Sequence, residues 1–180
     1  MNREEILRWR DKYDKEEDLY NKGVEEELRI KFNKNNCIDK NDLVRIVKWK
    51  FQGRLIGRQQ RILKMLEGED DDLITGVSKL AFHIKDDKKR VELLCTIDGI
   101  GTALASTILT FFDPANYGVF DIHAWRELFK KEPKSLFSDK KNVIRFFERL
   151  RQLSRKNELS CREIEKALFK INYDNSKRKK

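Results

Sequence analysis

A glycine-rich turn and an aspartate downstream of it are the parts of this sequence whose residue types and spacing can do chemistry. Gly99 and Gly101 let the backbone turn sharply and leave no side chain between the peptide amides and an approaching phosphate. The helix expected after Gly101 adds unpaired amides and a partial positive charge at its start. Gly99, Ile100, Gly101 and Thr102 therefore predict a site that holds a nucleic acid backbone without reading its sequence. The alternative is an ordinary tight connection between two helices.

The downstream aspartate is Asp121, in the stretch Val119-Phe120-Asp121-Ile122-His123-Ala124-Trp125. A carboxylate near the anomeric carbon of a sugar stabilises the positive charge that develops as a glycosidic bond breaks, and it can orient water. Asp121 is therefore the candidate catalytic residue. It is also well placed to cap a helix over about residues 122–130, and capping alone is the alternative interpretation.

These two segments resemble the motifs of the helix-hairpin-helix (HhH-GPD) DNA glycosylase superfamily. In that family a Leu-Pro-Gly-Val-Gly-like hairpin precedes a Val-Asp-x-His motif, which here read Ile97-Asp98-Gly99-Ile100-Gly101 and Phe120-Asp121-Ile122-His123. The segment Phe120–Trp125 is most similar to the Val-Asp-Val-His-Met-Trp of 8-oxoguanine glycosylases. The similarity covers Leu93–Leu128. It implies a DNA glycosylase of base excision repair that acts on a damaged or mismatched base in double-stranded DNA, with Asp121 as its catalytic carboxylate and the target nucleotide flipped out of the helix.

One departure from the family pattern bears on the mechanism. Bifunctional members place a lysine two residues after the second hairpin glycine, where its amine attacks the sugar, and this chain has Ala103 there. We therefore expect a monofunctional hydrolase in which water takes part. A lysine outside the hairpin is the other route to lyase activity. A non-catalytic DNA-binding protein that recognises distorted DNA is the alternative from a different functional class.

The sequence predicts no resident metal cluster. Many family members hold an iron–sulfur cluster on four C-terminal cysteines, whereas of the three cysteines here only Cys161 lies in the C-terminal region. The two histidines, His83 and His123, give little support to a metal site built on imidazoles. The acidic stretch 67–72 is explained more simply by helix capping than by a bound cation. The resemblance to the family is also compatible with a monovalent cation bound by the backbone carbonyls of the hairpin.

Aromatic and basic residues supply candidates for a base pocket. A flipped base can stack on Trp49 or Phe51 while Lys48, Lys50 or Arg54 holds the strand. The alternative is that Trp49 is a core residue among solvated lysines. His123 and Trp125 follow Asp121 within about one helical turn, and packing inside the fold is the alternative for both. The full set of candidates for the pocket or for strand contacts is Trp49, Lys50, Phe51, Arg54, His123 and Trp125.

The elements that must position these residues are expected to be helices. Apolar residues recur at helical spacing, as at Leu43, Ile46 and Val47, and the chain has only 8 glycines and 2 prolines. We therefore predict an all-α protein with one helical unit at residues 1–174 and a basic tail at 175–180. An arrangement in two lobes, with the terminal helices in one and about residues 40–130 in the other, is compatible with the family fold.

Local signals place several helix ends. Asn2 with Glu5 three residues later, and the segment Asp39–Asp42, are typical helix starts. Residues 33–36 predict a break, and a helix that buries Leu104, Ile108 and Phe111 should end near residues 113–114, because proline disfavours helix at the preceding residue.

Charge and hydropathy narrow the choice of partner and compartment. With 40 Lys and Arg against 31 Asp and Glu, the formal net charge is +9, which favours a polyanionic partner such as DNA. No apolar run approaches the roughly 20 residues that span a bilayer, and the odd cysteine count fits a reducing compartment. We expect a cytoplasmic protein, with no membrane segment, that works on DNA as a monomer.

Overall fold

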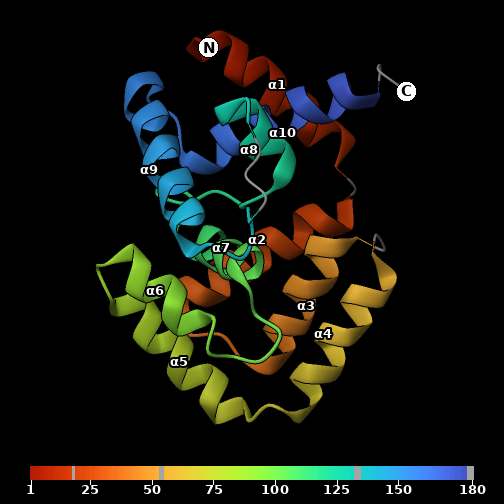
Figure 1. The fold of residues 1–180 in the computed structure, drawn as a ribbon, viewed down its shortest axis with the longest axis vertical. Helices are drawn as coiled ribbons and strands as arrows, with labels where there is room; N and C mark the ends of the chain where they lie inside the picture. Colours follow the sequence, from red (N-terminus) through yellow and green to blue (C-terminus); the bar gives the residue numbers. More distant parts are fainter. Residues whose placement is uncertain (18, 53–54, 132–134, 178–180) are drawn as a thin grey trace.

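The regular structure of the described residues is entirely α-helical, as predicted (Figure 1). The computed structural model describes residues 1–17, 19–52, 55–131 and 135–177, and leaves the side chains of residues 19 and 20 undescribed. Within these ranges the helices are α1 (Arg3–Glu16), α2 (Leu19–Asn35), α3 (Lys40–Phe51), α4 (Ile56–Gly68), α5 (Asp71–His83), α6 (Asp87–Leu94), α7 (Thr102–Phe112), α8 (Ile122–Phe129), α9 (Lys140–Asn157) and α10 (Cys161–Lys177). No helix in these ranges has both the length and the apolar character needed to cross a bilayer.

The helix starts predicted from capping residues are confirmed. The Asn2 side chain accepts a hydrogen bond of 2.9 Å from the amide of Glu5 at the start of α1. Asp39 and Asp42 form a reciprocal capping box at the start of α3. Asp70, from the acidic stretch, accepts from the amide of Asp72 at the start of α5. These bonds span only two or three residues, which is why the sequence reveals them.

Two predicted helix ends differ from the structure. Helix α2 continues to Asn35, through most of the predicted break, and the backbone leaves the helix at Asn36, which has a positive φ of 53°. Helix α10 runs through Lys177, so the first half of the predicted tail is helical, and residues 178–180 lie outside the described ranges. The predicted end near residue 113 is confirmed, since Asp113 is the C-cap of α7.

The helices pack in two groups around one hydrophobic cluster. Helix α10 packs against α1, α8 and α9, and both chain ends lie at this end of the molecule (Figure 1). Helix α7 packs against α2, α3, α6 and α9, while α4 contacts α3 and α5 contacts α6. Thus α2 packs with the central helices, and α8 packs with the terminal ones. A single core cluster runs through both groups, and the division into two lobes stays a prediction.

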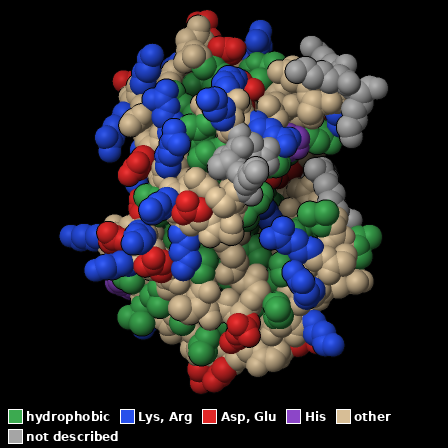
Figure 2. Space-filling model, viewed as in Figure 1, with side chains coloured by type: hydrophobic (Ala, Val, Ile, Leu, Met, Phe, Trp, Pro, Cys, Tyr) green, Lys and Arg blue, Asp and Glu red, His purple; other side chains and the backbone are tan. Residues whose placement is uncertain are grey.

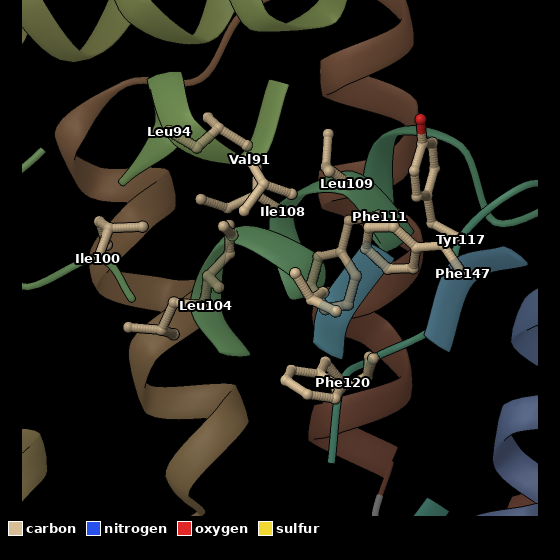
Figure 3. Close-up of a cluster of buried hydrophobic side chains, with 14 of the residues drawn as sticks. Val91, Leu94, Ile100, Leu104, Ile108, Leu109, Phe111, Tyr117, Phe120 and Phe147 are labelled. Atoms are coloured by element: carbon tan, nitrogen blue, oxygen red, sulfur yellow. The ribbon is translucent and has the colours of Figure 1, made fainter. Parts of the chain in front are cut away.

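Helix α7 forms the centre of this core. Leu104, Ile108 and Phe111 are buried, as predicted. Figure 3 shows them close to side chains from neighbouring elements, among them Val91 and Leu94 of α6. Full burial of side chains of this size stabilises the folded state by about 1.5–3 kcal/mol each. The first turn of α7, which follows the Gly-Ile-Gly segment, is therefore held firmly in place.

Candidate functional site

The turn before α7 needs glycine at residue 99 and leaves open space at residue 101. Gly99 has a φ of +80°, and a Cβ there would lie 3.2 Å from Cγ2 of Ile62 in α4. The turn is closed by a 3.1 Å hydrogen bond from the amide of Ile100 to the carbonyl of Ile97. At Gly101 a Cβ would meet no atom within 4 Å. The two glycines thus serve different purposes, backbone conformation at Gly99 and an unobstructed approach at Gly101.

The start of α7 presents backbone rather than side chains to its surroundings. Gly101 is exposed and is the N-cap residue, and no side chain in the described ranges caps this helix. The side chain of Ile100 is buried in the core. Thr102 is buried too, and its hydroxyl donates a 2.7 Å hydrogen bond to the carbonyl of Phe137. Any anion held at this turn therefore meets main-chain amides and the positive end of the helix dipole.

Asp121 uses its two carboxylate oxygens differently. Its Oδ1 accepts a 2.8 Å hydrogen bond from the amide of His123, so the predicted cap of α8 is confirmed. Its Oδ2 lies 3.7 Å from Nζ of Lys50 at the end of α3. The side chain is 24% exposed. One oxygen is committed to the helix, and the other lies beside a lysine.

A cavity of about 260 Å³ brings the turn and Asp121 together. Figure 2 shows the surface hollowed on the right of the view, between the part that contains α8 and α10 and the part that contains α3 and α4. The walls come from the end of α3, from α4, from the turn and the start of α7, and from the segment that begins α8. The lining includes Lys50, Phe51, Arg58, Gly99, Gly101, Ala103, Phe120, Asp121, His123, Phe137 and Phe169.

Three of the predicted pocket residues line this cavity. Phe51 contributes an aromatic ring, and the guanidinium of Arg58 lies 5.9 Å from its centroid. Lys50 and His123 are the other two. Arg58 was not among the sequence candidates, because an exposed arginine in a charged helix carries no distinguishing local signal. Arg54 lies outside the described residues.

The prediction that Trp49 forms part of the base pocket is wrong. Its side chain is 4% exposed, and its ring packs edge-on against Phe111 with centroids 4.9 Å apart. Its indole Nε1 donates a 3.1 Å hydrogen bond to the carbonyl of Asn21. Trp49 and Phe51 are two positions apart in α3, so they point to different faces of the helix. Trp49 is a core residue and cannot stack on a base in the cavity.

Trp125 is also a core residue. It is 2% exposed, and its Nε1 donates a 2.6 Å hydrogen bond to the carbonyl of Lys131. Its ring packs edge-on against Phe120, with centroids 5.9 Å apart. Since Phe120 lines the cavity, Trp125 supports the wall from behind and does not form part of it.

His123 both lines the cavity and packs within the fold. Its Nδ1 lies 3.0 Å from Oδ1 of Asn172 in α10. Phe169 and Tyr173, also in α10, pack against the imidazole edge-on, with centroid separations of 5.4 and 5.5 Å. These contacts hold the start of α8 against α10, so the position of Asp121 depends on the C-terminal helix.

Lys50 lies in a largely buried position beside Asp121. Its side chain is 13% exposed, and it lines both the main cavity and a smaller one of about 70 Å³ next to it. Burial lowers the pKa of the Lys50 ammonium, and the negative charges of Asp121 and Glu165 offset only part of that effect. The structure thus places Lys50 at the candidate catalytic carboxylate.

A buried ion cluster also lines the smaller cavity, through Arg162 and Glu165. Arg162 of α10 donates hydrogen bonds of 2.9 and 2.7 Å to the two carboxylate oxygens of Glu25, and it also contacts Glu165. Glu165 accepts a 3.3 Å hydrogen bond from the amide of Val119, in the segment that leads to Asp121. Burial raises the pKa of Glu165 despite the neighbouring guanidinium. No local signal in the sequence reveals this cluster, because Glu25 and Arg162 are 137 residues apart.

Potential metal ligands do not gather in the described ranges. No group of three or more His, Cys, Asp or Glu side chains there is placed to hold a metal ion. Cys37, Cys95 and Cys161 are unpaired. The predictions about an iron–sulfur cluster and a hairpin cation stay predictions.

Comparisons of this chain with protein-family models, with curated proteins and with solved structures found no match.

Proposed function

We propose that this protein is a DNA glycosylase of the HhH-GPD type that hydrolyses the N-glycosidic bond of a damaged or mismatched base. The observation that carries the proposal is that one cavity of about 260 Å³ contains both the Gly-Ile-Gly turn and the Asp121 carboxylate in its walls. The turn supplies a place for a DNA phosphate, and the carboxylate supplies chemistry at a sugar next to that phosphate.

The proposed reaction uses each wall of the cavity for one task. Main-chain amides at Gly101 and Thr102 hold the DNA backbone, and the net charge of +9 adds affinity that depends on salt. Lys and Arg side chains also gather over α9 (Figure 2). The flipped nucleotide enters the cavity, where its base stacks on Phe51 or another lining aromatic ring. Asp121 Oδ2 then stabilises positive charge on the sugar and orients the attacking water.

Asp121→Asn separates this reaction from DNA binding. Duplexes carrying uracil, 8-oxoguanine, hypoxanthine or an alkylated base are incubated with the protein, and abasic sites are then cleaved chemically. We expect release of at least one base by the wild type, and loss of that release with retained DNA binding in the variant. Asparagine caps a helix about as well as aspartate, so the fold should survive the change.

A second candidate function is recognition of distorted DNA without catalysis. It is favoured by the structural role of Asp121, whose Oδ1 caps α8 and whose Oδ2 lies opposite Lys50. Tight binding to damaged duplexes, with no base released from any of them, would support this second function and contradict the first.

The hairpin contact has its own test, because the structure leaves room for a side chain at Gly101 but not at Gly99. Gly101→Val should leave the folded structure intact and weaken DNA binding, because the new side chain blocks the approach of a phosphate to the amides. The logarithm of the DNA-binding constant should also fall linearly with the logarithm of the salt concentration. If affinity is insensitive to salt and unchanged in Gly101→Val, DNA is not the partner.

A further inference from the structure

Lys50 occupies the part of the cavity where a nucleophile would be useful. It lines the same cavity as Ala103. Ala103 stands at the hairpin position where bifunctional glycosylases have their lysine nucleophile. The Nζ of Lys50 is 3.7 Å from Asp121 Oδ2. An atom of a substrate that approaches the Asp121 carboxylate from the cavity is therefore also within reach of the Lys50 amine.

The surroundings of Lys50 differ from those of a structural lysine. An ammonium has three donors, but the ion pair recorded for Lys50 within the described ranges is the single long contact with Asp121. By comparison, Lys31 lies 2.5 Å from Asp39 and 2.8 Å from Asp42. Burial also lowers the pKa of Lys50, and a lowered pKa favours nucleophilic attack by a lysine amine. An amine with a single long ion pair at a cavity wall is placed to act as a nucleophile.

We propose that Lys50 attacks the C1′ aldehyde carbon of an abasic site in DNA and so gives this protein a strand-cleaving activity besides base release. This inference rests on the proposed function for its choice of DNA as substrate. It takes up the alternative of a lysine outside the hairpin, which the presence of Ala103 left open.

The reaction balances without an added reagent. The Nζ lone pair adds to the aldehyde carbon, the amine loses its protons, and the aldehyde oxygen leaves as water, which gives an imine. Loss of a proton from C2′ then expels the 3′ phosphate by breaking the C3′–O bond. Hydrolysis of the imine by water releases an unsaturated aldehyde on the DNA end and regenerates Lys50. Asp121 Oδ2 is placed to take up protons in these steps.

The test uses the full chain and a duplex with a preformed abasic site, so that it does not depend on base release. Borohydride reduces an imine to a stable amine and leaves a covalent protein–DNA adduct that survives denaturing electrophoresis. We expect a trapped adduct with the wild type, and proteolysis with mass spectrometry should locate the DNA remnant on Lys50. An adduct on the Met1 amine or on other lysines only, or no adduct, would overturn the proposal.

Two variants of Lys50 and a matched control test whether the reaction needs the amine itself or only a positive charge beside Asp121. Lys50→Arg keeps a positive charge beside Asp121 but cannot form an imine, since the guanidinium stays protonated. Lys50→Gln removes the charge as well. Both should reduce the adduct and the strand cleavage to the level of DNA without protein, with thermal unfolding confirming that they are folded. Lys79→Gln, at an exposed position in α5 that does not line the cavity, should leave the adduct unchanged. Persistence of the adduct in Lys50→Arg would contradict the assignment.

The readouts distinguish failure of this inference from failure of the proposed function. Base release without a trapped adduct would leave the glycosylase proposal standing and remove the role of Lys50. A Lys50 adduct on preformed abasic sites, without release from any damaged duplex, would support Lys50 and contradict the glycosylase.

Discussion

Two largely buried cations, Arg162 and Lys50, line the smaller cavity, and their hydrogen bonds and ion pairs differ greatly. Arg162 is 5% exposed, binds both oxygens of Glu25 and contacts Glu165. Its guanidinium also lies 5.4 Å from the ring centroid of Trp49. Lys50 is 13% exposed and has one ion pair, the 3.7 Å contact with Asp121.

Their pKa values move in opposite directions because their carboxylate neighbours differ. Burial disfavours the charged form of both groups. At Arg162 the charges of Glu25 and Glu165 outweigh burial and hold the pKa of the guanidinium above its usual range. At Lys50 burial prevails and the pKa is lowered. A cation with close carboxylate partners serves the fold, whereas one that burial leaves short of partners is available for chemistry.

The largest expected effect is on stability, at Arg162. Arg162→Ala leaves the carboxylates of Glu25 and Glu165 buried without their cation, and breaking a buried pair in this way costs about 3–5 kcal/mol. Urea unfolding followed by circular dichroism measures the loss. Lys50→Gln is the comparison, and we expect it to cost much less. Equal losses of stability in the two variants would show that Lys50 and Arg162 contribute equally to the fold, and would contradict the distinction between them.

Asp121→Asn should show the reverse pattern, with a large effect on activity and a small one on stability. We expect base release to slow about 100- to 1000-fold, the range found when one electrostatic group that stabilises a transition state is removed. The free energy of unfolding should change by less than about 0.5 kcal/mol, because asparagine retains the cap of α8. Single-turnover kinetics and urea unfolding give the two values. A loss of stability that accounts for the lost activity would make Asp121 a purely structural residue.

Glu25→Gln should weaken the Arg162 cluster without removing it. An amide keeps one acceptor but loses the charge, and hydrogen bonds to charged groups contribute about 1.5–3 kcal/mol. The loss should grow with pH across the acid range. Burial raises the pKa of the wild-type Glu25, but Arg162 together with Lys166 and Arg29 outweighs burial, so the pKa is lowered. The stabilising contribution of Glu25 is therefore present above the unfolded-state pKa and lost as pH falls through the folded-state value. Urea unfolding at several pH values tests this, and a pH-independent loss would contradict it.

The smallest expected effect is the contribution of Lys50 to the pH dependence of the free energy of unfolding. Since its pKa is lower in the folded than in the unfolded protein, where it is about 10.4, the unfolded state binds more protons between the two values. Its contribution to stability is fully present above the unfolded-state pKa and is lost as pH falls through the folded-state pKa. The stability of the wild type relative to Lys50→Gln should therefore rise between pH 7 and pH 10. A constant difference over that range would show that Lys50 is ordinarily solvated.

Much of the fold was predictable because helix signals are local. The caps at Asn2, Asp39, Asp70 and Asp121 are bonds within two or three residues, and all four are in the structure. The buried face of α7 follows from helical spacing in the same way. The end of α2 was predicted less well, because a run of polar residues does not say which of them leaves the helix.

The candidate site was predictable only where the residues are close in sequence. The turn at Gly99 and Gly101 was identified from glycine alone, and its positive φ is present at Gly99. Trp49 and Phe51 looked equivalent as stacking residues, yet only Phe51 lines the main cavity. Which face of α3 meets the core depends on α2 and α7, which pack against it, and no window of sequence around α3 contains that information.

The sequence by itself determined the helical segments, the glycine turn and the aspartate that caps α8. Each of these depends on residue type or on bonds across a few positions. Only the tertiary structure decided that Lys50 lies beside Asp121 and that Arg162 binds Glu25. Lys50 and Asp121 belong to α3 and to the start of α8, and Arg162 and Glu25 belong to α10 and α2. Their distances are set by how these helices pack around the shared core.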